Sequence, residues 1–195
     1  MAFFNWGGLF SMKLAAYVDF LLAYNEKVNL VSKKSTRETV GVLISESLLL
    51  KNHISTPFVI DAGSGGGLLG IPLALAFPEK KIVLSESVQK KARFLHLVVE
   101  ELQMKNVVVW PGAIQEFMQR QKKTAVSIIS RGFPRIDILA DFVYKQAARE
   151  LVLITSPSKI LNIKKKVAKT EQKSYNIPSR NNLIIFKMEN VSRET

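Results

Sequence analysis

A short apolar segment that runs into a cluster of glycines constrains the fold of this chain more than any other feature. Residues 58–60 are apolar, Asp61 follows, and glycine occupies four of the positions 63–67 before a second apolar stretch begins. Pro72 suits the first turn of a helix, where its missing amide hydrogen costs little, and Pro78 prevents that helix from continuing. The order predicts a strand, a tight loop and a helix.

The rest of the chain repeats this alternation. Apolar runs of strand length recur between stretches with helical spacing. We expect strands at 82–84, 107–110, 126–129 and 151–154, and helices at 88–102, 114–120, 136–146 and 158–169. Two last strands, 175–177 and 183–188, flank a run whose turn residues favour a hairpin. Because parallel strands need long crossovers, we predict an α/β fold with a doubly wound, mostly parallel sheet and a C-terminal antiparallel hairpin.

Helices are also expected before the first strand. Apolar residues recur at helical spacing from Leu14 to Val28 and again from Val40 to Leu48. We expect residues 1–56 to form an N-terminal helical extension and 57–195 a core, within a single domain, because 195 residues of which 47% are apolar suit one domain. Asp19 interrupts the apolar start, which favours an amphipathic helix over a signal peptide. No apolar run approaches the roughly 18 residues needed to cross a bilayer, so no membrane partner is expected.

The amino-acid composition excludes some kinds of site and favours one kind of partner. The chain has no cysteine, which excludes disulfides, thiolate metal sites and cysteine nucleophiles. No metal site is expected. The net charge of +12 favours a polyanionic partner over a merely solvated basic surface.

The glycine loop is the candidate ligand site. In doubly wound sheets ligands bind beyond the carboxyl ends of the strands, and glycines let a ligand approach the backbone closely. A tight turn without a ligand is the alternative. Gly65, Gly67 and Gly70 fit the dinucleotide pattern G-x-G-x-x-G, so a nicotinamide or flavin enzyme stays open. Glu86, after the second strand, could accept hydrogen bonds from the ribose of either kind of nucleoside.

Asp61 favours one of these ligands. The run Asp-Ala-Gly-Ser-Gly-Gly-Gly from Asp61 resembles the first motif of Rossmann-like methyltransferases, D-x-G-x-G-x-G. An acidic loop start complements the zwitterionic end of S-adenosylmethionine better than a pyrophosphate. We therefore favour a methyltransferase over a dinucleotide enzyme.

Neighbouring segments resemble the GidB or RsmG family of bacterial small-subunit (16S) ribosomal RNA guanine-N7 methyltransferases. Residues 24–30, YNEKVNL, are similar to W-N-x-x-x-N-L, and residues 61–73 to D-x-G-[ST]-G-x-G-x-P-G-I-P-L. Residues 86–95 resemble D-S-x-x-K-[KR]-x-x-F-L, and 130–133 resemble S-R-A-[FV]. The resemblance covers roughly residues 20–140 and implies a single class I methyltransferase domain.

The resemblance implies a cofactor site but no catalytic acid or base. Residues of the first loop would contact S-adenosylmethionine, Ile114 and Gln115 would hold its adenine, and Arg131 would orient the cofactor or the target. The expected cofactor-binding residues are Asp61, Gly63, Ser64, Gly65, Gly67, Leu68, Glu86, Ile114, Gln115 and Arg131. Guanine N7 carries a lone pair and no proton, so catalysis would come from alignment, and the product would be S-adenosylhomocysteine.

The chain departs from the family pattern at several positions. Leu69 replaces a proline, Glu86 an aspartate and Gln115 a glutamate. Residues 43–48, LISESL, stand where the family has R-H-[IF]-x-D-S-L, and residues 155–159 replace a lysine-glycine pair. A divergent binding protein with lost or retargeted activity therefore stays open, as does a methyltransferase for a small metabolite. The expected partner is ribosomal RNA or the small ribosomal subunit, and the expected state is a cytoplasmic monomer.

Overall fold

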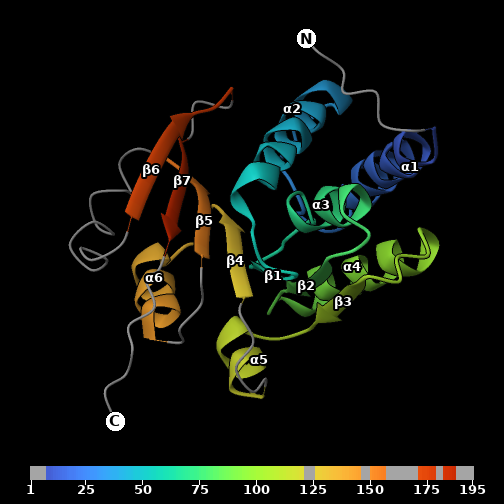
Figure 1. Ribbon diagram of the computed structural model, residues 1–195. Helices are drawn as coiled ribbons and strands as arrows, with labels where there is room; N and C mark the ends of the chain where they lie inside the picture. The colour runs from blue at the N-terminus through green and yellow to red at the C-terminus, as the bar shows by residue number, and fades with distance from the viewer. Residues whose placement is uncertain (1–7, 121–125, 146–149, 157–170, 179–181, 188–195) are drawn as a thin grey trace.

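The computed structural model describes residues 8–120, 126–145, 150–156, 171–178 and 182–187. Strands and helices alternate through most of this part (Figure 1). The strands are β1 Phe58–Ala62, β2 Lys81–Ser85, β3 Val107–Trp110, β4 Val126–Arg131, β5 Glu150–Thr155, β6 Glu171–Asn176 and β7 Asn182–Lys187. The helices are α1 Gly8–Asn25, α2 Arg37–Leu48, the 3-10 helix η1 Leu49–His53, α3 Gly70–Ala76, α4 Gln89–Glu101, α5 Ile114–Arg120 and α6 Ile136–Lys145.

The strands form a seven-stranded sheet in the order β3-β2-β1-β4-β5-β7-β6. Strands β1 to β5 pair in parallel, with Phe58 of β1 opposite Lys81 of β2 and Val126 of β4. Strand β7 is antiparallel to both β5 and β6. The predicted mostly parallel sheet with a C-terminal hairpin is therefore confirmed.

Helices cover both faces of the sheet because successive strand residues point to opposite sides. Val59 of β1 belongs to one buried cluster, which contains apolar residues of α1, α2, α3 and α4. Its neighbour Ile60 belongs to a second cluster, which contains residues of α5 and α6. In Figure 1, α1, α2 and α3 lie above the sheet and α5 and α6 below it. The strands are accordingly apolar on both faces, as parallel strands require.

The N-terminal helices end where local hydrogen bonds turn the chain. Asn25 closes α1, and its Oδ1 accepts the N–H groups of Leu30 and Val31 over 2.8 and 3.0 Å. Thr36 begins α2 with a capping box, in which its side chain and that of Thr39 each accept the other residue's backbone N–H. Val28, expected on the apolar stripe of the first helix, lies beyond the end of α1, because the loop closed by Asn25 begins there.

The predicted elements differ from the observed ones mainly at their ends. Strand β3 and helix α5 have the expected bounds, whereas β1 and β4 extend two residues further, to Ala62 and Arg131. The expected helix at 158–169 lies outside the described residues. Among the helices of the described part, none is both long enough and apolar enough to span a membrane.

Candidate functional site

The loop between β1 and α3 is shaped by glycines. Gly63, Gly65 and Gly67 have φ angles of +70°, +58° and +82°. At Gly67 a Cβ atom would also lie 2.7 Å from Cγ1 of Ile71, so both the conformation and the packing require glycine there. The loop therefore has a backbone path that a chain with side chains at these positions would not follow.

Hydrogen bonds attach this loop to the end of β2. The N–H groups of Gly63 and Ser64 donate to the main-chain oxygen of Ser85 over 2.9 and 3.0 Å. Glu86 accepts from two backbone amides, that of Gly65 at Oε2 and that of Val88 at Oε1, each over 2.8 Å. The carboxylate thus joins two turns that follow neighbouring strands.

Asp61 is a buried carboxyl at the start of the loop. Only 2% of it is exposed, and its Oδ2 accepts the N–H of Gly70 over 3.0 Å. Burial raises the pKa of Asp61 to about 7, although the hydrogen bond from Gly70 and the nearby guanidinium of Arg131 favour the charged form. A positive charge placed beside this carboxyl would favour its ionised state.

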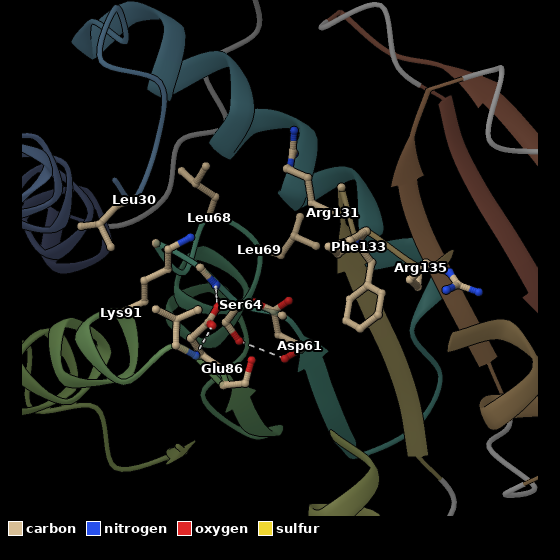
Figure 2. Close-up of a pocket in the computed structure, with 17 residues that line it drawn as sticks. Leu30, Asp61, Ser64, Leu68, Leu69, Glu86, Lys91, Arg131, Phe133 and Arg135 are labelled. Carbon is tan, nitrogen blue, oxygen red and sulfur yellow. Dashed lines mark hydrogen bonds between the residues drawn. The ribbon is translucent and has the colours of Figure 1, made fainter. Parts of the chain in front are cut away.

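A cavity of about 540 Å³ opens beside the loop at the carboxyl ends of β1, β2 and β4. Figure 2 shows the residues that line it, which come mainly from the glycine loop, from the turn after β2 and from residues 131–135 at the end of β4 and just beyond it. Of the predicted binding residues, those that line it are Asp61, Gly63, Ser64, Gly65, Leu68, Glu86 and Arg131. The structure thus brings most of the predicted set together around one space.

Three predicted residues do not line this cavity. Gly67 packs against Ile71 and Leu95 behind the loop. Ile114 is 2% exposed and belongs to the cluster under α5 and α6, and Gln115 follows it on α5. Their contact with a ligand stays a prediction.

Arg131, at the end of β4, is held by helix α2. Its Nη1 donates to Oε2 of Glu46 over 2.9 Å, and its Nη2 donates to the main-chain oxygen of Leu43 over 2.9 Å. In Figure 2 its side chain extends from β4 towards α2. The side chain of Glu46 is fully buried and that of Arg131 is 15% exposed. Burial lowers the pKa of Arg131, whereas the hydrogen bond and charge of Glu46 raise it.

Glu46 is not among the site residues expected from the sequence. The aspartate of the family segment R-H-[IF]-x-D-S-L is absent from residues 43–48, but Glu46 stands directly before Ser47 and Leu48, as that aspartate does. The segment therefore keeps a carboxylate, one methylene longer. This match to D-S-L is the sequence signal that could have identified Glu46. Its partner Arg131 is 85 positions away in the sequence, and the pattern does not indicate that contact.

An aromatic side chain forms part of the wall opposite Glu86. Phe133 lines the cavity, and a Cβ atom on Gly63 would lie 3.1 Å from Cδ2 of its ring. Lys91 and Arg135 lie on opposite sides of the cavity in Figure 2. The site thus combines two carboxyl groups, an aromatic ring and basic side chains. Among the residues that the structure describes, no three His, Cys, Asp or Glu side chains are grouped as metal ligands would be.

Comparison with known sequences points to one family. The model of the GidB family, described as rRNA small subunit methyltransferase G, matches residues 11–185. A protein named ribosomal RNA small subunit methyltransferase G from Nitrosomonas eutropha is 37% identical over 127 residues, which are 65% of this chain and 58% of that protein. One of the same name from Photobacterium profundum is 34% identical over 132 residues, 68% of this chain and 63% of that protein. The chain thus spans less than two thirds of the length of these relatives.

Comparison with solved structures gives the fold. An O-methyltransferase from Bacillus cereus in complex with SAH has a TM-score of 0.66 and 14% identity, over 89% of this chain and 91% of that one. The magnesium protoporphyrin IX methyltransferase of Synechocystis with bound SAM has a TM-score of 0.60 and 16% identity, over 88% and 97% of the two chains. The sheet and its helices therefore have the Rossmann-like methyltransferase architecture.

Proposed function

The chain belongs to the GidB family, and from that premise we propose that it is an S-adenosylmethionine-dependent enzyme that methylates guanine N7 in small-subunit ribosomal RNA. The observation that carries the proposal is the cavity at the carboxyl ends of β1, β2 and β4, lined by the glycine loop and by Glu86. S-adenosylmethionine would supply a methyl group activated by its sulfonium and would leave as S-adenosylhomocysteine.

The lining residues fit this cofactor. A cavity of about 540 Å³ lies within the size range of small-molecule sites. Each oxygen of Glu86 accepts one backbone N–H, and a carboxylate oxygen has a second acceptor site, which a ribose hydroxyl could use. The carboxyl of Asp61 would complement a positively charged group, as its position at the start of the loop predicts. Gly63 and Gly65 leave the backbone accessible where a side chain would fill the space.

The opposite wall supports binding of a nucleotide substrate. Phe133 offers a ring on which a base could stack, and the rim residues Lys91 and Arg135 carry charges suited to phosphates. Arg131 lines the cavity, and its buried Nε has no hydrogen-bond partner among the described residues, so one donor of this guanidinium is unused within the protein. The net charge of +12 favours the same partner.

The proposed reaction requires the protein to align the target base with the methyl donor. Guanine N7 has no proton to remove, so the residues of the cavity need to hold the base and the methyl donor in line.

The proposal also includes the ten binding residues expected from the sequence and a protein that is a cytoplasmic monomer. It further includes one domain, with a helical extension at 1–56 and a core at 57–195. The single domain is supported by a buried cluster that contains residues of α1, α2 and the sheet.

The test is mass spectrometry of ribosomal RNA incubated with the purified protein and S-adenosylmethionine, as naked RNA and as small subunits. We expect 7-methylguanosine at one position, and weaker RNA binding at higher salt, with a log-log slope of roughly −0.7 to −0.9 per phosphate contact. Methylation of a small metabolite alone, with a flat salt response, would contradict the RNA substrate.

Calorimetry separates the remaining alternatives. Binding of S-adenosylmethionine without methylation of any RNA form would favour a binding protein that has lost turnover, which the changes at 43–48 and 155–159 motivate. Binding of NAD and not of S-adenosylmethionine would replace the proposal by a dinucleotide enzyme.

A further inference from the structure

Helix α1 packs directly on the glycine loop through a tyrosine. Tyr17 is fully buried, and its hydroxyl donates to the main-chain oxygen of Gly66 over 2.7 Å. Leu21, one turn further along α1, and Leu30 cover the same glycine. A Cβ atom on Gly66 would lie 2.9 Å from Cδ1 of Leu21 and 3.3 Å from Cβ of Leu30. The helix therefore contacts the backbone of the loop itself.

The peptide unit between Gly66 and Gly67 is held at both ends. Its oxygen accepts the hydroxyl of Tyr17, and its N–H, that of Gly67, donates to the main-chain oxygen of Ser64 over 2.8 Å. Without Cβ atoms, these glycines would otherwise have a wide choice of backbone angles. The two bonds fix the plane of the peptide and, with it, the path of the backbone along the cavity.

The loop leaves donors available beside this peptide. In the part of the chain that the structure describes, the N–H of Gly66 and that of Leu68 donate to no protein acceptor, and both residues line the cavity. Rotation of the Gly66–Gly67 peptide would move the backbone on either side of it. The hydroxyl of Tyr17 therefore affects the position of the N–H groups of Gly66 and Leu68, although Tyr17 itself does not line the cavity.

Tyr17 remains a donor under ordinary conditions. Burial, and secondarily the carboxyl of Asp61, raise the pKa of Tyr17 well above its usual range. The phenol therefore keeps its proton, and a phenolate, which could not donate to the carbonyl of Gly66, does not form.

We propose that Tyr17 is a positioning residue of the cofactor site, whose hydroxyl holds the Gly66–Gly67 peptide in the orientation that binds S-adenosylmethionine. The inference rests on the proposed function and adds to it a role for a residue of the N-terminal extension. A loop that adopts its binding conformation for only part of the time binds its ligand more weakly by that fraction. The hydrogen bond from Tyr17 keeps the loop in its binding conformation and so prevents this loss of affinity.

The variant that tests this role is Tyr17→Phe, which deletes the hydroxyl and keeps the buried ring. Its matched control is Tyr24→Phe on the same helix. The ring of Tyr24 packs against Phe20 and Phe94, and its hydroxyl makes no hydrogen bond among the described residues. Calorimetry with S-adenosylmethionine should show binding about tenfold weaker for Tyr17→Phe, because a carbonyl loses its only side-chain donor. Tyr24→Phe should stay within about twofold of the parent protein.

Amide exchange measured by NMR on the unliganded full chain gives a second readout. In Tyr17→Phe the amide of Gly67 should exchange about tenfold faster, while amides of β4 and β5 keep their protection, which shows a local rather than a global effect. Equal loosening throughout the chain, an unchanged affinity, or an equal loss of affinity in Tyr24→Phe would each overturn the positioning role. Failure of the parent protein to bind S-adenosylmethionine would instead overturn the proposed function.

Discussion

The two walls of the cavity hold their charged side chains by different means. On the glycine-loop wall, Glu86 is held by backbone amides of Gly65 and Val88, both close to the ends of neighbouring strands. On the other wall, Arg131 is held by Glu46 and by the carbonyl of Leu43, both on a helix of the N-terminal extension. The first arrangement depends on local backbone geometry, whereas the second depends on the docking of α2.

Because of this difference, substitutions in the first wall should mainly change ligand affinity, and substitutions in the second wall should mainly change folding stability. A carboxylate bound by backbone amides can be changed without leaving an opposite charge buried, so the effect should appear mainly in ligand affinity. An ion pair whose carboxylate is fully buried leaves an uncompensated charge when one partner is removed. The cost of changing the second wall should therefore appear mainly in folding.

The largest expected effect is that of Glu46→Ala. Loss of the carboxylate leaves the guanidinium of Arg131 largely buried without its counter-ion, and the free energy of unfolding should fall by about 3 kcal/mol. Urea denaturation measures it. The double variant Glu46→Leu with Arg131→Met should recover much of that loss, because neither charge of this ion pair then remains buried. If Glu46→Ala left stability unchanged, the two walls would not differ as described.

The next effect concerns the first wall. Glu86→Gln replaces one acceptor oxygen by an amide group that faces a backbone N–H, and removes the charge. We expect binding of S-adenosylmethionine to weaken roughly a hundredfold, because hydrogen bonds to a charged group contribute about 1.5–3 kcal/mol each. Calorimetry measures this loss. Glu101→Gln, at the exposed end of α4, is the matched control and should bind normally. An equally large loss of stability in Glu86→Gln would remove the contrast with Glu46.

The smallest effect concerns Asp61, which lies between the walls. Its pKa is about 7 in the folded protein against 3.8 ordinarily, so between these values the folded state holds a proton that the unfolded chain has released. The free energy of unfolding should therefore fall as pH rises through this window, by about 1 kcal/mol from about pH 5.5 to about pH 6.5.

The matched variant for this pH dependence is Asp61→Asn. Urea denaturation at the two pH values should show that the variant lacks this part of the slope. The affinity of the parent protein for a cationic cofactor should rise as pH approaches 7, with release of a proton, because the ligand favours the carboxylate. Parallel slopes for the two proteins would contradict the raised pKa.

The contrast between the walls also explains what the sequence could predict. Asp61, Glu86 and the glycines lie within one strand-loop-helix pattern and its neighbour, and periodicity located both strands to within two residues. The roles of Glu46 and Tyr17 depend on contacts with residues 85 and 49 positions away. Spacing within a helix indicates which face is buried, but not which backbone atom of a distant loop that face meets.

The order of the strands has a consequence for how this site can change. After β1 the chain crosses to the side of α1–α4, and after the adjacent β4 it crosses to the side of α5 and α6. The two connections diverge, so a crevice between the ends of these strands follows from the winding of the chain and not from the side chains that line it. Substitutions of the side chains that line the crevice can therefore alter what it binds while the crevice itself is inherited unchanged.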